Sequence, residues 1–299
     1  MNVKHLKFSE VVITRIIQAA GYLSILYVSL IVLFLLIEGL PALADFPISN
    51  LFSTRWYPIE EYYGILPLLS GSLIITIGAA LIAMPLGILT AVYMSEVVPE
   101  WANQILKPLV EILAGIPSVV LGFIGIIVLS PYLRETFNLP TGLNAFTGAL
   151  LLGWAAIPTV VSISEDALNN VPSSYRDASL ALGATRWQTI WRTTVPAARS
   201  GILTAVMLGV GRVIGETMTV MMVTGNAPTM PTGLQSFFRP IRTMTATIAS
   251  EMGEVATGSS HYHILFLIGI ILFTVSLAIN LASFMLSARR NKRSERLLS

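Results

Sequence analysis

The segment Leu66–Met94, LPLLSGSLIITIGAALIAMPLGILTAVYM, contains no charged side chain and is long enough to cross the roughly 30 Å hydrocarbon core of a bilayer as a helix. The whole chain of 299 residues has the same character, with 54% hydrophobic and only 11% charged residues. Soluble proteins usually carry about 25% charged residues, so the composition predicts an integral membrane protein. Because the chain has no cysteine, disulfides and cysteine-ligated metals are excluded.

Five further segments share this length and apolar character. The six predicted spans are Ile16–Ile37, Leu66–Met94, Leu109–Leu129, Leu143–Ser164, Ile202–Val223 and His263–Leu286. Pro85, Pro117 and Pro158 lie inside three of these spans, where a proline is expected to kink the helix. The first span is longer than the roughly 7–15 apolar residues of a signal peptide, so we expect an uncleaved anchor. The predicted fold class is an all-α integral membrane protein with six transmembrane helices.

Lysine and arginine are distributed unevenly between the two sides of these spans. The N-terminal segment, the loops at 95–108 and 165–200 and the C-terminal tail carry 13 of them, against four on the opposite side. Cytoplasmic segments are enriched in Lys and Arg, so both termini are predicted to be cytoplasmic in a multi-pass protein of the inner (plasma) membrane. The predicted regions are 1–65 (N-terminal tail, first span and external loop), 66–290 (core, with a cytoplasmic loop at 165–200) and 291–299 (basic cytoplasmic tail).

The cytoplasmic loop between the fourth and fifth spans has the pattern of two short helices. Ser174 and Asp177 have the spacing of a capping box, which predicts a helix start, and Gly183 is expected to end that helix in a left-handed conformation. The capping spacing recurs from Thr185, and Pro196 is expected to end the second helix. Such a knob could dock a cytoplasmic partner; alternatively, the loop could lie on the headgroups with its arginines on anionic lipid.

The fifth span contains two charged residues. Its sequence from Gly211 to Asn226 is GRVIGETMTVMMVTGN, with Arg212 four residues before Glu216. A charge at the centre of a membrane helix costs roughly 2.5–3.5 kcal/mol on insertion scales, so such residues are functional candidates. At this spacing the two side chains are expected to meet on one helix face and to pair.

Arg212 has the chemistry of an anion site. A guanidinium stays charged and presents a planar fork of donors that matches phosphate or carboxylate oxygens. Glu216 would then compete with a passing oxyanion for Arg212 and keep binding weak enough for release. The alternative is a buried ion pair that only fixes helix packing, with Gly209, Gly211 and Gly215 allowing a neighbouring helix to approach closely.

The pattern Asp177-Ala178-Ser179, followed by Gly183 and Pro196, resembles the EAA loop of binding-protein-dependent ABC importer permeases, with Asp in place of Glu and Ser in place of the second Ala. The spacing of the motif fits at each of these points. In that family the loop inserts into a cleft of the cytoplasmic ATPase subunit. The resemblance therefore implies that Asp177, Ala178, Gly183 and Pro196 form the element that couples to the ATPase.

Three stretches are similar to the C-type permease subunits of phosphate-specific (Pst) ABC importers. They are the Gly211–Asn226 stretch, LAGIPSVVLGFIG at Leu113–Gly125 and TMTATIASEMGE at Thr243–Glu254. This resemblance implies a type I ABC importer permease fold and places Arg212 and Glu216 in a phosphate path. It also implies a second (A-type) permease, two ATPase subunits and an extracytoplasmic phosphate-binding protein as partners, besides membrane lipid.

The chain contains no G-x-x-x-x-G-K-[ST] sequence, so ATP and Mg²⁺ are expected in the partner ATPase and no cofactor is expected in this chain. We expect a non-enzymatic permease, without catalytic or metal-binding residues and without a nucleic-acid partner. Two alternatives stay open: an ABC permease for another oxyanion, such as sulfate or molybdate, and a secondary phosphate carrier driven by protons or sodium. In the external loop before the last span, Gln235–Gly253 is expected to contain a partial helix.

Overall fold

The structure, a computed structural model, describes residues 3–298, without the side chains of residues 3–9, 234, 283, 284 and 286–298. The first half of the chain forms α1 (Val3–Gly39), α2 (Ala42–Asp45), α3 (Ile48–Leu51), β1 (Trp56–Tyr57), the 3₁₀ helix η1 (Pro58–Glu60), β2 (Tyr62–Tyr63), α4 (Leu66–Glu96), α5 (Glu100–Ala114), α6 (Ser118–Ile124), the π-helical η2 (Gly125–Leu129), α7 (Ser130–Thr136) and α8 (Ala145–Asn169). The second half forms α9 (Ser173–Ala181), α10 (Arg186–Thr189), the π-helical η3 (Ile190–Thr194), α11 (Val195–Ala197), α12 (Arg199–Gly215), α13 (Met218–Val223), the 3₁₀ helix η4 (Leu234–Phe238), α14 (Met244–Glu251) and α15 (Ser260–Leu298).

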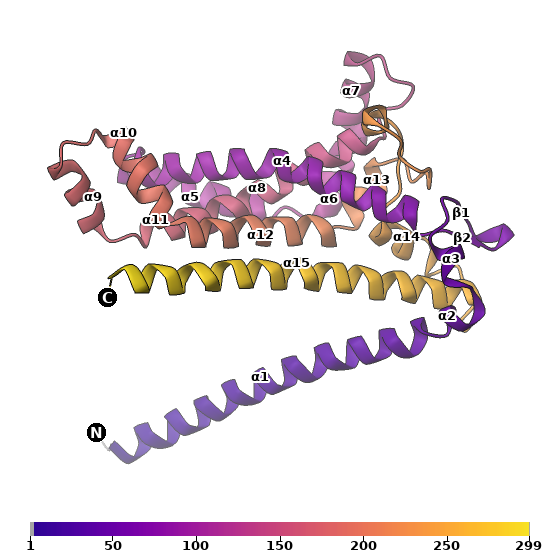
Figure 1. Ribbon diagram of the computed structural model, residues 1–299, viewed down its shortest axis with the longest axis horizontal. Coiled ribbons are helices and arrows are strands. Elements are labelled where there is room, and N and C mark those ends of the chain that lie inside the picture. The colour runs from indigo at the N-terminus through magenta and orange to yellow at the C-terminus, as the bar shows by residue number, and fades with distance from the viewer. Residues whose placement is uncertain (1–2, 299) are drawn as a thin grey trace.

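Long helices lying side by side dominate the molecule, with α9 and α10 at one end of the bundle and β1 and β2 at the other (Figure 1). Among the described residues, five helices are long and apolar enough to cross a membrane, or six if the bent pair Arg186–Ala197 and Arg199–Gly215 crosses as one span. The predicted all-α membrane fold is therefore confirmed, with five to six spans, and the partial helix predicted within Gln235–Gly253 is present as α14. In the predicted orientation the α9–α10 end is cytoplasmic, and we refer to the opposite end as the outer end.

The third and fifth predicted spans are not continuous helices, which corrects the expected kink at Pro117 and the expected continuous fifth helix. The segment Leu109–Leu129 is divided at Gly115–Pro117, where α5 ends and α6 begins, and the span-length helical run is Ser118–Thr136. Proline has no N–H group and disfavours a helical residue before it, so Pro117 begins a new helix instead of bending an old one. Pro85 and Pro158, in contrast, lie inside α4 and α8 as predicted.

Close contact between α4 and α8 forms the centre of the bundle. A Cβ atom built on Gly87 would lie 2.7 Å from Val160 Cγ1, and one on Gly78 would lie 2.8 Å from the Cβ of Ala149. Small residues at these positions bring the two helices together, which is how membrane helices gain packing energy without a hydrophobic driving force. The most apolar part of α8 is accordingly 56% buried.

The helix α1 leaves the bundle at an angle (Figure 1) and buries none of the residues in its most apolar stretch. It contacts α15 near its C-terminal end, where the Phe34 and Phe266 rings meet edge to face at 5.4 Å and Gly39 packs against Ile270. The side chains of the predicted basic tail at 291–299, and the whole of Ser299, lie outside the described residues.

At the outer end, three side chains from separate elements meet around the carboxylate of Glu251. We refer to Trp56, Arg242, Glu251 and His261 as the outer cluster. Glu251 accepts a hydrogen bond from Trp56 Nε1 at 3.1 Å, pairs with Arg242 and contacts His261 Nε2 at 2.8 Å. Burial alone would raise the pKa of Glu251, but the hydrogen bonds from His261 and Trp56 and the charge of Arg242 outweigh it and hold that pKa below its ordinary value.

We predict that Glu251→Gln destabilises the detergent-purified protein at neutral pH, because Arg242 loses its charged partner. A lowered native pKa contributes stability above the unfolded pKa, and this contribution disappears as the pH falls through the native pKa. The difference in thermal unfolding temperature between wild type and variant should therefore narrow as the pH is lowered below about 4.5, the ordinary value for Glu. An unfolding temperature that differs equally at every pH would contradict this role.

Candidate functional site

The fifth span breaks at Glu216, and the break separates the two charged residues that were expected to pair. The helix α12 ends at Gly215, the backbone of Glu216 is extended (ψ 129°), and α13 starts at Met218. The four-residue spacing brings side chains together only within a continuous helix, so the predicted ion pair between Arg212 and Glu216 is wrong. Among the described residues, no carboxylate lies within ion-pair distance of Arg212.

Glu216 instead satisfies the backbone at the break. Its carboxylate Oε1 accepts hydrogen bonds from the amides of Thr217 (3.2 Å) and Thr219 (3.3 Å), at the start of α13. A negative charge is favourable at a helix N-terminus, where amides have no partner within the helix. On the other side of the break, the hydroxyl of Thr245 on α14 donates to the carbonyl oxygen of Glu216 at 3.0 Å.

Arg212 lies at the second break, between α5 and α6. Its Nη1 donates to Thr159 Oγ1 on α8 at 2.9 Å, and its Nη2 donates to the carbonyl oxygen of Ala114, the last residue of α5, at 3.3 Å. The two breaks are also joined directly, because Thr219 Oγ1 donates to the carbonyl oxygen of Ser118 at 3.0 Å. A guanidinium has five N–H groups, so Arg212 keeps donors beyond those two bonds.

Open space borders part of the α12 surface near its C-terminal end. A Cβ atom built on Gly211 or Gly215 would meet no atom within 4 Å, whereas one on Gly209 would lie 2.7 Å from Val160. Within this chain, a neighbouring helix therefore packs closely at Gly209, whereas Gly211 and Gly215 have no close neighbour. Irregular backbone at membrane depth persists only where protein covers it or where it lines a water-filled cavity. Paired helix breaks beside an open face are the arrangement found at the substrate sites of many transporters.

The predicted two-helix knob is present at the cytoplasmic end, with one corrected detail. Gly183 has φ +85°, its amide bonds to the carbonyl of Leu180, and the Ala184 amide bonds to that of Ser179, which together make the Schellman stop expected of a glycine. Thr185 caps α10 in a complete capping box, as predicted. The capping box from Ser174 is wrong: α9 starts after Pro172 without a side-chain cap.

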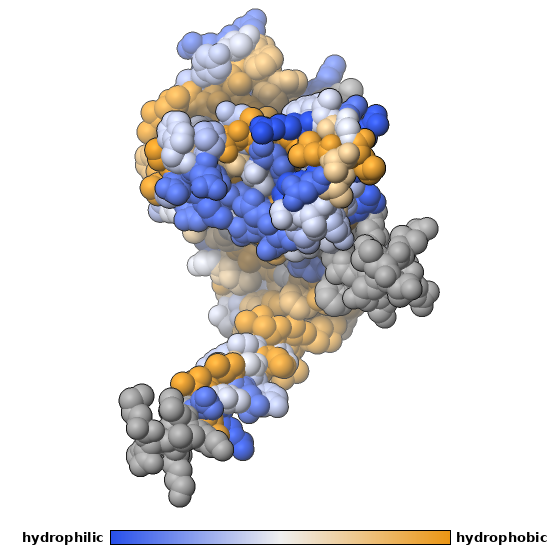
Figure 2. Space-filling view, turned by 90° about the vertical axis from the view of Figure 1, so that its left-hand side faces the viewer, coloured by the Kyte–Doolittle hydropathy of each residue, from blue (hydrophilic) through white to orange (hydrophobic). Residues whose placement is uncertain are grey.

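Three of the four predicted coupling residues, Asp177, Ala178 and Gly183, are exposed on this knob, and Pro196 lies half-buried in α11. The knob also exposes large apolar side chains, including Leu182 (90% exposed) and Trp187 (62% exposed). Viewed from this end, polar and apolar residues lie next to each other on the surface (Figure 2). Isolated exposed apolar residues are ordinary, but a contiguous group on a rigid projection indicates a protein contact.

Arg176, immediately before Asp177, is a residue that the sequence analysis missed. Its Nη2 donates to Glu96 Oε1 on α4 at 2.6 Å and to the carbonyl oxygen of Leu168 in α8 at 3.0 Å. Its Nη1 donates to the carbonyl oxygen of Val171, just after α8, at 2.8 Å. One side chain therefore joins the knob to the two central helices of the bundle. The available signal was Glu96, an acidic residue at the end of an otherwise uncharged span.

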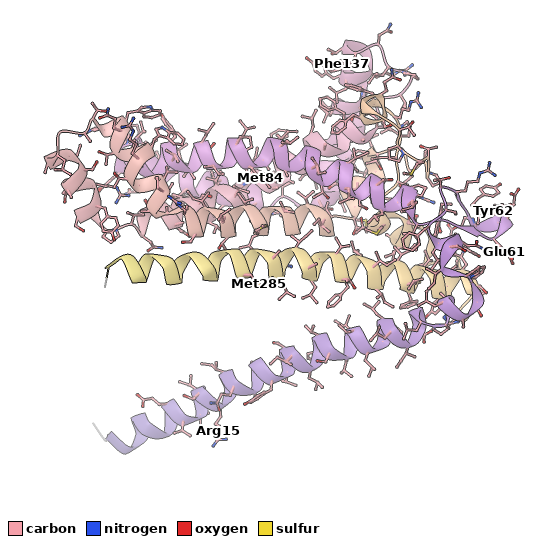
Figure 3. The ribbon with its side chains drawn as sticks, in the orientation of Figure 1. Arg15, Glu61, Tyr62, Met84, Phe137 and Met285 are labelled. Carbon is pink, nitrogen blue, oxygen red and sulfur yellow. The ribbon has the colours of Figure 1, made fainter. Side chains whose placement is uncertain are left out.

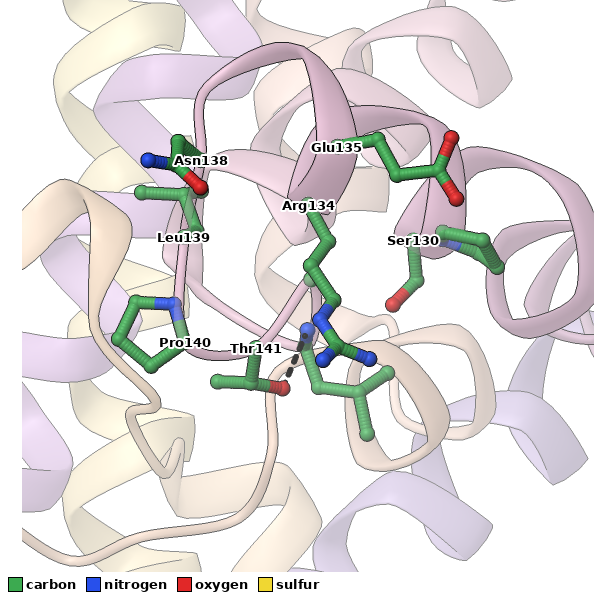
Figure 4. Close-up of a pocket in the computed structure, with 10 residues that line it drawn as sticks. Ser130, Arg134, Glu135, Asn138, Leu139, Pro140 and Thr141 are labelled. Atoms are coloured by element: carbon green, nitrogen blue, oxygen red, sulfur yellow. Dashed lines mark hydrogen bonds between the residues drawn. The ribbon is translucent and has the colours of Figure 1, made fainter.

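A cavity of about 570 Å³ lies at the outer end, between α7 and the loop to α8 (Figure 4). Arg134 and Thr141 line it, and Thr141 Oγ1 accepts a hydrogen bond from the amide of Leu143 at 3.1 Å. It contains neither Arg212 nor Glu216. Among the described residues, no group of three or more His, Asp or Glu side chains has a metal-binding arrangement.

Comparison with known proteins agrees with this architecture. Residues 83–292 match the family described as binding-protein-dependent transport system inner membrane component. The chain is 40% identical over 280 residues to the "Probable ABC transporter permease protein YqgH" of Bacillus subtilis (strain 168), covering 92% of this chain and 90% of that protein. It is 33% identical over 305 residues to the "Phosphate transport system permease protein PstC" of Mesorhizobium japonicum, covering 95% and 92%.

The solved structures show the same fold. A bacterial alginate ABC transporter, crystallised with its alginate-bound periplasmic protein, superposes with a TM-score of 0.63 over 97% of this chain and 98% of that chain, at 17% sequence identity. The family match covers both helix breaks and the complete cytoplasmic knob. This chain therefore belongs to the binding-protein-dependent transport permease family, with a type I ABC importer permease fold of the PstC type.

Proposed function

We propose that this chain is the membrane permease subunit of an ATP-driven phosphate importer. The family consists of non-enzymatic membrane permeases whose ATPase is a separate subunit. The observation that carries the phosphate assignment is Arg212, a half-buried guanidinium held at the junction of two broken helices. The relatives named as phosphate permeases support the same substrate.

Phosphate suits a guanidinium at this place. It carries about −1.5 to −2 charges near neutral pH by analogy with a phosphoester, and its oxygens match the planar fork of Arg212. Because Arg212 already bonds Thr159 and Ala114, its orientation is fixed before the anion arrives. A site that binds with only the remaining donors holds the anion weakly enough to release it, as transport requires.

Glu216 has a different role from the competitor first expected. Its carboxylate lies at the start of α13, where it accepts hydrogen bonds from two backbone amides that would otherwise attract an anion. We assign to it the task of keeping these donors satisfied, so that phosphate meets Arg212 without being trapped at the helix end.

The partners follow from the exposed faces. We assign the open face near Gly211 and Gly215, and the exposed apolar side of α5, to contact with a second, A-type permease that completes the path. The knob with Asp177 and Gly183 docks one of two cytoplasmic ATPase subunits, which bind ATP and Mg²⁺. An extracytoplasmic phosphate-binding protein delivers the substrate at the outer end, and both termini are cytoplasmic.

We predict that Arg212→Gln lowers phosphate uptake to background while membrane insertion stays normal. Arg212→Lys should restore little uptake, because a point charge lacks the planar fork. Radiolabelled uptake in cells or liposomes is the measurement, with sulfate and molybdate as competing anions because a guanidinium binds these too. Arg134→Gln, in the separate outer cavity, is the matched control and should transport normally. Wild-type uptake by Arg212→Gln would refute the assignment of the path.

The cap at α13 gives a second prediction. Glu216→Gln should keep stability close to wild type, because an amide oxygen still accepts the bonds from Thr217 and Thr219. Glu216→Ala should destabilise the protein by about 1 kcal/mol, the usual cost of removing a helix cap. Thermal unfolding in detergent distinguishes the two variants. If both were equally destabilised, a lost charge pair would be the better explanation.

The link from the knob to the bundle gives a third prediction. Arg176→Gln should lower phosphate transported per ATP hydrolysed by several-fold in the reconstituted complex, because knob movement no longer reaches Glu96 on α4. Arg199→Gln is the control, since Arg199 is exposed and bonds only the nearby carbonyl of Pro196. Both complexes must assemble equally in co-purification, and an unchanged transport ratio in Arg176→Gln would contradict the link.

A further inference from the structure

The β1–η1–β2 hairpin projects from the outer end of the molecule, with Glu61 and Tyr62 at its far edge (Figure 3). Its tip exposes a large apolar group: Ile59 is 84% exposed, Tyr57 49% and Tyr62 46%. Glu60 and Glu61 are exposed beside it. The tip therefore offers an apolar centre with two adjacent carboxylates.

The backbone conformation at Glu61 indicates that its side chain has a role in binding. Glu61 has φ +60°, a left-handed conformation that glycine adopts without strain and other residues adopt at a cost. A turn that only reversed the chain would be more stable with glycine at this position. Backbone strain of this kind is tolerated where a side chain is needed at that point, which is common at binding sites.

The base of the hairpin is rigid, in contrast to its exposed tip. Trp56 and Tyr63 are the paired residues at the base, they are 3% and 5% exposed, and their rings meet edge to face at 5.9 Å. Trp56 also donates to Glu251 at the C-terminal end of α14. A displacement of the tip is therefore passed to α14 through the buried base of the hairpin.

The other end of α14 reaches the break in the fifth span. Thr245, in its first turn, donates to the carbonyl oxygen of Glu216, and the Met244 amide bonds to Ser72 Oγ on α4 at 3.0 Å. The next residue, Ala246, packs in the same apolar cluster as Val213 and Val220, which flank the break. One two-turn helix thus connects the outer cluster to the backbone of Glu216 at the break.

We propose that residues 57–62 of the hairpin dock the extracytoplasmic binding protein, and that α14 carries this docking to the break at Glu216. The family depends on such a protein, and the hairpin lies at the end of the bundle opposite the ATPase knob. Its partner surface is an apolar socket bordered by basic side chains, complementary to Ile59, Glu60 and Glu61. The proposal rests on the importer function proposed above.

Docking is tested by measuring how tightly the binding protein that supports uptake, loaded with its ligand, binds the complete transporter in nanodiscs. Ile59→Ser combined with Glu61→Lys should weaken binding by about tenfold or more, the scale of losing one central anchor. Glu135→Lys makes the same charge reversal on α7, an outer projection separate from the hairpin, and should bind like wild type. Unchanged affinity in the hairpin variant, or equal weakening in both variants, would overturn the docking assignment.

The transmission half is tested by stimulation of ATP hydrolysis by the same binding protein. Trp56→Phe removes the bond to Glu251 and keeps an aromatic ring at the site, and Thr245→Val removes the bond to the Glu216 carbonyl with nearly unchanged side-chain shape. Both should keep basal hydrolysis and docking affinity but lose several-fold of the stimulation. If either folds as wild type in a thermal scan and is stimulated normally, the route through α14 is wrong. Neither measurement depends on which anion is carried, so a failed phosphate assignment in the Arg212 uptake assay is a separate result.

Discussion

Inside a bilayer, a backbone group that leaves a helix must find its partner within the protein, because hydrocarbon provides no hydrogen bonds. The break at Glu216 meets this constraint from both directions, with its own carboxylate on the amides of α13 and the hydroxyl of Thr245 on its carbonyl. Satisfying the break fixes α14 against the fifth span and separates Glu216 from Arg212. The guanidinium is thereby left to the second break, where it is oriented by Ala114 and Thr159.

Features that depend on neighbouring residues were predictable from the sequence. Gly183 and Thr185 form their stop and cap through bonds to residues within five positions, and both expectations hold. The pairing of Arg212 with Glu216 was wrong because it assumed a continuous helix, while the contact that stabilises the break comes from Thr245, 29 residues away. Pro117 shows the same limit, because Pro85 and Pro158 stay inside their helices while Pro117 precedes a new one.

The two ends of the bundle use the same chemistry for different attachments. At the cytoplasmic end Arg176 joins the knob to Glu96, and at the outer end Arg242 joins the loop before α14 to Glu251. All four side chains are between 9% and 24% exposed, so each pair is partly shielded from water yet close to a polar boundary. Pairs in this position avoid the full cost of burying an ion while they hold a connecting segment against a neighbouring helix.

Because α1 is separated from the other helices, its residues are under different packing constraints from those of α4 and α8. In α4 and α8, a single added methyl group at Gly78 or Gly87 would collide with a neighbour, so shape constrains the residue. Along most of α1 no neighbour within the chain imposes such a shape, because its most apolar stretch is unburied. One aliphatic residue in this stretch could therefore be exchanged for another without disturbing the packing of α4 against α8, while the stretch keeps its affinity for lipid.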